Sequence, residues 1–218
     1  MVSKKRILLV RHGKTEWNGL SRFQGKTDVP LDEEGRRQAQ CLAMRLDQFP
    51  PFPVVFSSSL SRAEETARII VSGRCGTDVS IHEGLSEMSF GEWEGHSIHE
   101  IESRDPESFR KWKESPFEYL PPGAEPFPSL ESRVRLALAE ISSAGQEHIF
   151  VVTHGGIVRA ALAILLSLPL SSVWRMKISN CSVTGIDVGK RGASLAFLND
   201  DIHTLVDPSE APKLPFPV

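Results

Sequence analysis

Residues 6–18 read Arg-Ile-Leu-Leu-Val-Arg-His-Gly-Lys-Thr-Glu-Trp-Asn, and this stretch decides the fold. The apolar run at 7–10 is too short for a helix and predicts a buried strand. Arg11, His12 and Gly13 follow this strand directly. Because open α/β sheets bind their ligands at the carboxyl ends of strands, we expect Arg11 and His12 to face a ligand.

A second apolar run far along the chain ends in the same way. Residues 149–153 read Ile-Phe-Val-Val-Thr, and His154, Gly155 and Gly156 follow. Helix N-termini favour anions, and the two glycines open an expected helix at 156–168. Two buried strands that end in histidine, one of them beside an arginine, therefore indicate a phosphate site with a nucleophilic imidazole.

Strand and helix signals alternate along most of the chain. This alternation predicts an α/β protein with three layers, in which helices cover both faces of a mostly parallel sheet. The expected strands lie at 7–10, 54–56, 79–82, 148–153, 182–188 and 193–198, and the expected helices lie at 32–46, 60–71, 129–143 and 156–168. We expect a single domain over residues 1–218.

Two segments interrupt this rhythm. Residues 84–128 contain six prolines and two tryptophans, and they predict a cap insertion with one short helix around 97–112. Residues 199–218 carry four prolines and predict a tail on the surface.

The overall composition limits the possible partners. The chain has 218 residues, 40% of them hydrophobic, and a net charge of −3 without a long basic run. We therefore expect a sizeable core and neither nucleic acid nor a membrane as partner. Cys41, Cys75 and Cys181 are widely spaced, which argues against a disulfide framework or a zinc site. No apolar stretch is long enough for a secretory or membrane-spanning segment, so a reducing cytoplasm is the default.

Five residues have the chemistry that phosphoryl transfer needs. Arginine binds phosphate oxygens through a planar, permanently charged fork, and Arg11 and Arg62 are the candidates. His12 would accept the phosphoryl group, and His154 would donate a hydrogen bond to its oxygens. Glu87 would protonate the leaving alkoxide and then take a proton from water.

Each of these residues taken singly also has a structural explanation, and the joint placement favours the site. A lone histidine is usually structural or exposed, and this interpretation applies to five others: His82, His96, His99, His148 and His203. His96 and His99 have no third ligand, so we expect no metal, and we also expect no cofactor. Trp93 and Trp112 are interpreted as packing residues.

Other phosphate motifs do not fit the sequence. Gly13-Lys14-Thr15 and Gly25-Lys26-Thr27 look like the end of a P-loop. However, Leu8 and Leu20 stand where that pattern needs its first glycine.

Several blocks together resemble the histidine phosphatase superfamily, also called the phosphoglycerate-mutase-like family. The blocks are residues 9–18, 23–25, 28–31, 35–39, 57–67, 87–95 and 153–156. The resemblance implies that Arg11, His12, Arg62 and His154 form the phosphate pocket. It implies further that His12 is phosphorylated and that Glu87 is the proton donor. Additional phosphate or substrate contacts are implied for Asn18, Gln24, Gly25 and Gly155.

The family contains phosphatases and mutases, and the cap favours a phosphatase. Residues 88–128 hold nine acidic and four basic side chains, an unfavourable surface for a substrate with several anionic groups. The loop at 90–95 and residues 121–125 resemble α-ribazole phosphatases and broad-specificity phosphatases, although Ala124 replaces a usual glycine. We therefore expect a metal-independent phosphomonoesterase that acts on a small-molecule phosphate ester. A cofactor-dependent phosphoglycerate mutase and a non-catalytic phospho-ligand-binding protein are the alternatives, and the oligomeric state is open, with a dimer possible.

Overall fold

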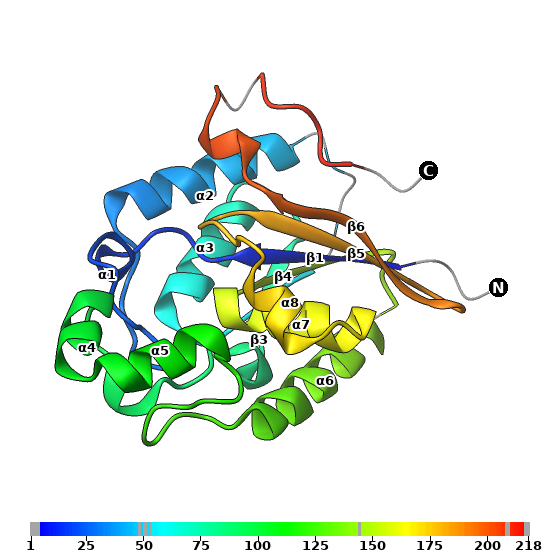
Figure 1. The fold of residues 1–218 in the computed structure, drawn as a ribbon. Coiled ribbons are helices and arrows are strands. Elements are labelled where there is room, and N and C mark those ends of the chain that lie inside the picture. The colour runs from blue at the N-terminus through cyan, green and yellow to red at the C-terminus, as the bar shows by residue number, and fades with distance from the viewer. Residues whose placement is uncertain are drawn as a thin grey trace.

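A computed structural model describes residues 5–47, 49, 52, 54–143, 145–207 and 210–215. Within these residues six strands form one sheet in the order β3-β2-β4-β1-β5-β6 (Figure 1). The strands are β1 (Lys5–Arg11), β2 (Val54–Ser57), β3 (Asp78–Ile81), β4 (His148–Thr153), β5 (Val183–Gly189) and β6 (Gly192–Asp200). The first four run parallel, whereas β5 is antiparallel to both β1 and β6. The predicted mostly parallel sheet is confirmed.

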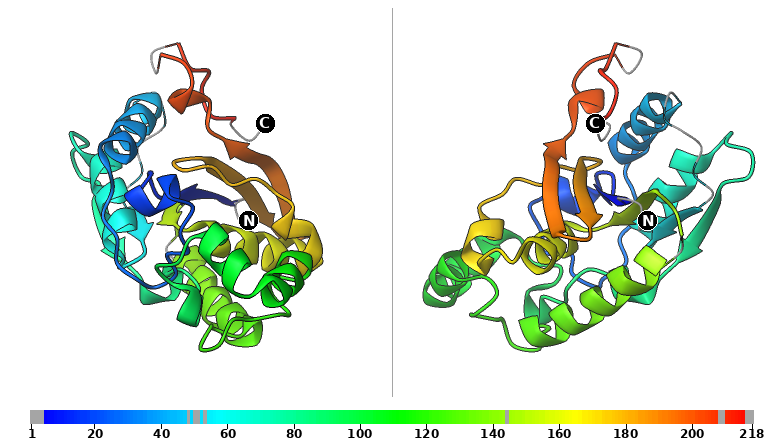
Figure 2. Two further views of the ribbon diagram at one scale, coloured as in Figure 1. Left: turned by 60° about the vertical axis from the view of Figure 1, so that its left-hand side comes forward. Right: turned by 90° about the vertical axis from the view of Figure 1, so that its right-hand side faces the viewer.

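Helices cover both faces of this sheet, as the sequence predicts (Figure 2). The described helices are α1 (Glu16–Gly19), α2 (Glu33–Leu46), α3 (Ser61–Val71), α4 (Ile98–Arg104), α5 (Pro106–Glu114), α6 (Phe127–Ser143), α7 (Gly155–Leu166) and α8 (Leu170–Trp174). Alternate side chains of a strand point to opposite faces. Leu8 and Val10 of β1 accordingly pack with α2 and α3, while Ile7 and Leu9 pack with α6 and α7. This arrangement is the predicted three-layer α/β/α fold.

The cap differs from the expected single helix. The structure has two helices there, α4 and α5, which meet at Asp105. Pro106 lacks the N–H that a continuous helix needs, and a proline favours the first turn of a new helix. The side chain of Asp105 accepts a hydrogen bond from the N–H of Ser108 and caps α5. The prediction of one helix over 97–112 is therefore wrong.

Two short helices were not predicted at all. Thr15 caps α1 through a reciprocal capping box with Asn18, between the strand expected at 7–10 and the helix expected at 32–46. α8 lies beyond Pro169, where the pattern gave no helix signal. The other expected helices and strands begin and end within two residues of the observed ones.

The cap has an aromatic core of its own. Phe23, Trp93, Ile101, Phe109 and Trp112 form a buried cluster. The packing interpretation of both tryptophans is confirmed, because their exposed fractions are only 6% and 8%. The cluster packs α4 and α5 against Phe23 of the loop after α1, and both helices lie at the end of the sheet toward which β1 points (Figure 1).

The expected surface tail is partly buried. β6 continues to Asp200, and the side chains of His203 and Leu214 are 0% and 3% exposed. Arg45 of α2 binds this segment through the carboxylate of Asp200 and the carbonyl of Pro212. Residues 208, 209 and 216–218 of the predicted tail lie outside the described residues. No helix in the described part of the chain is both long and apolar enough to cross a membrane.

Candidate active site

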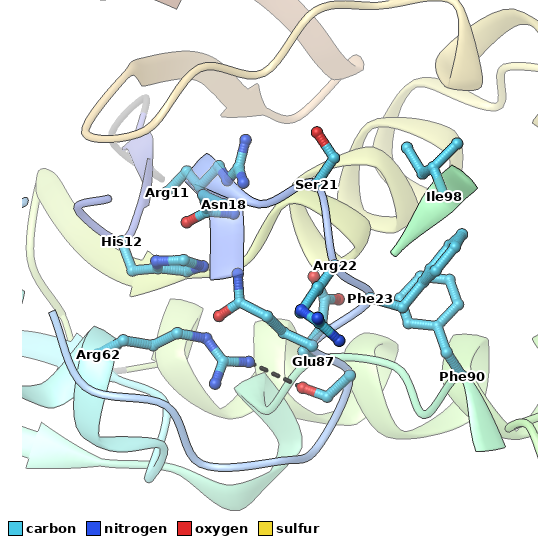
Figure 3. A pocket seen from close by; sticks show the side chains of 12 residues that line it. Arg11, His12, Asn18, Ser21, Arg22, Phe23, Arg62, Glu87, Phe90 and Ile98 are labelled. Atoms are coloured by element: carbon cyan, nitrogen blue, oxygen red, sulfur yellow. Dashed lines mark hydrogen bonds between the residues drawn. The ribbon is translucent and has the colours of Figure 1, made fainter. Parts of the chain in front are cut away.

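The carboxyl ends of the parallel strands meet around one cavity of about 230 Å³. Most of the predicted site residues line it, namely Arg11, His12, Asn18, Gln24, Gly25, Arg62 and Glu87 (Figure 3). His154 and Gly155 do not line it. The ring of His154 is fully buried, with its centroid 5.2 Å from that of His12.

His12 is held as a neutral imidazole with one free nitrogen. Its Nδ1 lies 2.7 Å from the carbonyl oxygen of Gly13. A carbonyl only accepts hydrogen bonds, so Nδ1 carries the proton and the lone pair is on Nε2. Burial lowers the pKa of His12 well below its ordinary value of 6.5, and the charges of Arg62 and Arg11 lower it further. The ring is therefore uncharged at neutral pH, with a lone pair on Nε2, and is chemically suited to nucleophilic attack.

Arg62 is held by the loop that follows α1. Its side chain is fully buried, and its two terminal nitrogens donate to the carbonyls of Thr27 (2.9 Å) and Gly25 (2.8 Å). Figure 3 shows the second of these bonds as a dashed line. Glu94 in turn fastens this loop, since its carboxylate accepts from the N–H groups of Lys26 and Thr27.

Arg11 is held from the other side of the cavity. One terminal nitrogen donates to the carbonyl of Ile178 at 2.7 Å. Burial lowers the pKa of Arg11 to about 10, which leaves the guanidinium charged at neutral pH.

Three buried nitrogen atoms at this site have no hydrogen-bond partner among the described residues. They are Nε of Arg11, Nε of Arg62 and Nδ1 of His154. Unpaired buried donors are costly, and an anion with several oxygens would satisfy them. The observed arrangement thus fits a phosphoryl group placed beside His12.

Glu87 faces the same cavity from the loop after β3. The side chain is 9% exposed, and its Oε2 accepts from the N–H of Gly156 at 3.1 Å, while Oε1 accepts from that of Met88. A Cβ atom at Gly156 would lie 2.4 Å from Oε1 of Glu87, so a larger residue there would have to displace the carboxylate. The carboxylate is thus docked on the first turn of α7.

Arg133 of α6 supports the Glu87 loop and was missed by sequence reasoning. Its guanidinium donates to the carbonyls of Gly84, Ser86 and Glu87 and pairs with Glu125 at 2.7 and 2.8 Å. Nothing in the local sequence distinguishes this arginine from others on exposed helix faces.

Asn180 was also missed. Its amide nitrogen donates to the carbonyls of His12 (3.1 Å) and Gly13 (3.3 Å) and to Oδ1 of Asn18 (3.2 Å). Oδ1 of Asn18 also accepts from Thr15, so the amide nitrogen of Asn18 remains available to a ligand. Asn180 reaches the site only because β5 pairs with β1.

The outer end of the cavity is mainly apolar. Phe23, Phe90 and Ile98 line it together with Ser21 and Arg22 (Figure 3). Arg22 is already engaged with the carbonyl of Gly95 and, at 3.4 Å, with Glu100.

The turn around Ala124 is intact despite the missing glycine. Gly123 has φ of 74°, in the left-handed region, and the N–H of Ala124 donates to the carbonyl of Pro121. The geometry around Glu125 therefore does not depend on a glycine at position 124.

Comparisons with known proteins agree with this geometry. A model of the "Histidine phosphatase superfamily (branch 1)" matches residues 7–201. Phosphoserine phosphatase 1 of Hydrogenobacter thermophilus is 32% identical over 199 residues, which cover 91% of this chain and 93% of that protein. Adenosylcobalamin/alpha-ribazole phosphatase of Salmonella typhimurium is 32% identical over 197 residues, covering 89% and 96%.

A solved structure is similar as well. A mycobacterial glucosyl-3-phosphoglycerate phosphatase superposes with a TM-score of 0.81 at 30% identity, covering 90% of this chain and 99% of the other. The chain belongs to the histidine phosphatase superfamily. These three relatives bear the names of phosphatases, in agreement with a phosphoric monoester hydrolase.

Proposed function

We propose that this phosphomonoesterase transfers the phosphoryl group of its substrate to Nε2 of His12 and then to water. The observation that carries this proposal is the neutral, tautomer-fixed ring of His12 beside the guanidinium groups of Arg11 and Arg62, whose buried Nε atoms have no acceptor among the described residues.

In the first step Nε2 of His12 attacks phosphorus, and the bond between phosphorus and the ester oxygen breaks. Glu87 in its protonated form gives a proton to the leaving oxygen, so that an alcohol departs. Arg11 and Arg62 hold the phosphoryl oxygens through N–H groups that have no other acceptor. If the hydroxyl of Ser58 donates to Nε2 of His154, at 2.8 Å, Nδ1 of His154 carries an N–H for the same oxygens.

In the second step water attacks the phosphohistidine. The carboxylate of Glu87 takes a proton from that water, the bond between phosphorus and Nε2 breaks, and inorganic phosphate leaves. Both steps use the same carboxylate in opposite protonation states.

The charge of the cap favours water, rather than a second phosphorylated substrate, as the acceptor of the phosphoryl group. Two of its four basic residues are paired with glutamates on their own helix, Arg110 with Glu114 and Lys111 with Glu107. The cap therefore has little free positive charge with which to hold a phosphoglycerate.

The substrate in this proposal is a small-molecule phosphate ester. The relatives are named for phosphoserine, α-ribazole and glucosyl-3-phosphoglycerate phosphatases at similar identity, so the family alone does not select the leaving group. Release of phosphate from a panel of these esters would rank them. We also place the enzyme in the cytoplasm, on the basis of its cysteine pattern, and cell fractionation tests this location.

Labelling of the enzyme tests the mechanism. Protein quenched with acid during turnover of a ³²P-labelled ester should carry acid-labile label, and His12→Ala should carry none. His99 is exposed, and His99→Ala serves as the control that should label like the wild type. Hydrolysis by His12→Ala at the wild-type rate would contradict the proposal.

A further inference from the structure

His203 is a buried histidine that the proposed reaction does not use. It lies in a single turn, Ile202–Thr204, after β6 and beyond the residues 7–201 that match the family. Its side chain is 0% exposed. Such a position needs a physical reason, because a buried imidazole must find partners for both ring nitrogens.

Both ring nitrogens of His203 have partners, and these partners fix its tautomer. Nδ1 lies 3.2 Å from Nη1 of Arg45, and a guanidinium only donates, so Nδ1 accepts. The proton is therefore on Nε2, which donates to the carbonyl oxygen of Cys181 at 3.1 Å. Asp200 and Asp201 are the acidic groups around this ring.

Cys181 connects His203 to the nucleophile. The N–H of Cys181 donates to the carbonyls of Arg11 (3.0 Å) and His12 (3.2 Å). Its φ is 54°, a left-handed conformation that is unfavourable for any residue except glycine. This conformation turns the N–H of Cys181 toward β1 and its carbonyl toward His203, so a bond at the carbonyl helps to hold the N–H in place.

Arg45 fixes His203 from the opposite side. Its guanidinium binds both carboxylate oxygens of Asp200, at 2.7 and 2.8 Å, and its Nε donates to the carbonyl of Pro212. The Arg45 side chain is almost fully buried. A continuous series of hydrogen bonds therefore runs from α2 through the C-terminal segment to the backbone of His12.

We propose that His203 is a positioning residue for the nucleophile: by donating to the carbonyl of Cys181, it holds the backbone of Arg11 and His12 for in-line attack. This inference rests on the proposed role of His12. The C-terminal segment then contributes to phosphoryl transfer although none of its described side chains lines the cavity. Small displacements of reacting groups cost about a hundredfold in rate, which sets the scale of the effect.

Two substitutions distinguish the hydrogen bond from His203 to Cys181 from the one that His203 accepts from Arg45. In His203→Gln the side-chain amide nitrogen replaces Nε2 and retains the donor to Cys181. In His203→Asn the shorter side chain reaches Arg45 but not Cys181. His203→Met fills the volume without a donor and is the second variant if His203→Asn does not fold. Leu214→Ala removes a buried side chain from the same segment and is the control for a loss of stability alone.

The measurement is the single-turnover rate of ³²P transfer from labelled 4-nitrophenyl phosphate to the enzyme, together with inhibition by inorganic phosphate and thermal unfolding. We expect His203→Asn and His203→Met to slow labelling about tenfold or more, with the phosphate inhibition constant within about twofold of the wild type. His203→Gln should label at nearly the wild-type rate.

Three results would overturn the inference or its basis. If His203→Asn labels as fast as Leu214→Ala at comparable stability, or His203→Gln slows as much as His203→Asn, His203 has only a structural role. If the wild-type enzyme forms no phosphohistidine, the proposed mechanism itself fails, and this inference fails with it.

Discussion

The inner and outer ends of the cavity are built in opposite ways. The inner end consists of polar and charged side chains that are mostly buried, and Arg11, His12 and Arg62 are each held by backbone carbonyls. The outer end consists mainly of Phe23, Phe90 and the exposed Ile98, with Ser21 and Arg22 as its polar members (Figure 3). The difference suggests that the inner end performs chemistry common to all substrates, while the outer end selects the leaving group. The following predictions test that division, from the largest expected effect to the smallest.

Arg62→Ala should lower kcat/KM by roughly a hundredfold to a thousandfold, because a buried donor to the phosphoryl oxygens is lost. The loss should be similar for all phosphate esters, since every substrate presents the same group to the inner end. Steady-state kinetics on several esters measure this effect. Arg68 is exposed on the same helix and paired with Glu64, so Arg68→Ala should behave like the wild type. A loss that varies strongly with the leaving group would contradict the division of the cavity.

Low pH should lower the free energy of unfolding, because buried histidines at the inner end and in the C-terminal segment resist protonation in the folded protein. Burial is the main cause that lowers the pKa of His203 to about 4, from about 6.5 in the unfolded chain. Between these values the unfolded chain binds a proton that the folded protein does not, so the free energy of unfolding falls as pH decreases from 6.5 to 4. The contribution of His203 is about 3 kcal/mol, complete above pH 6.5.

Denaturant unfolding at a series of pH values measures this effect. His203→Gln should flatten the dependence without abolishing it, because burial also lowers the pKa of His12 and His154. An unchanged slope in His203→Gln would show that His203 titrates normally.

Gly156→Ala should slow turnover by about tenfold to a hundredfold, since the added methyl group displaces Glu87 from the first turn of α7. Inhibition by inorganic phosphate should change less, because the arginines are not displaced. Steady-state kinetics with phosphate as inhibitor check both expectations. Gly189 has open space around its Cβ position, so Gly189→Ala is the matched control. Equal activity of both variants would contradict the proposed role of Glu87 as proton donor and acceptor.

Ile98→Ala should change KM by only a few-fold, because the side chain is 41% exposed and buries limited apolar area. The change should depend on the leaving group, whereas phosphate inhibition should stay constant. Ile81 is equally exposed and does not line the cavity, so Ile81→Ala is the control in kinetics on the ester panel. A uniform change across the panel would mean that the outer end does not select the leaving group.

The sequence by itself determined the sheet and the residues that end its strands. Short apolar runs specify buried strands, and the polar residues after them must lie at one edge of a parallel sheet. His12, Arg62 and Glu87 were therefore located at the cavity from local patterns alone. The two tryptophans of the cap were likewise recognised as packing residues.

Only the tertiary structure decided what holds these groups in place. Asn180, Arg133 and His203 contact the site or its supports through hydrogen bonds to backbone carbonyls that are distant in sequence. The same holds for the tail, where Arg45 of α2 binds the carbonyl of Pro212 and part of the segment is buried. A local pattern records which face of an element is apolar, whereas the satisfaction of a buried donor depends on segments that meet only after folding. The proposed nucleophile is thus predicted from residues 6–18, but its tautomer, its neutral state and the contacts that hold it follow from the folded chain.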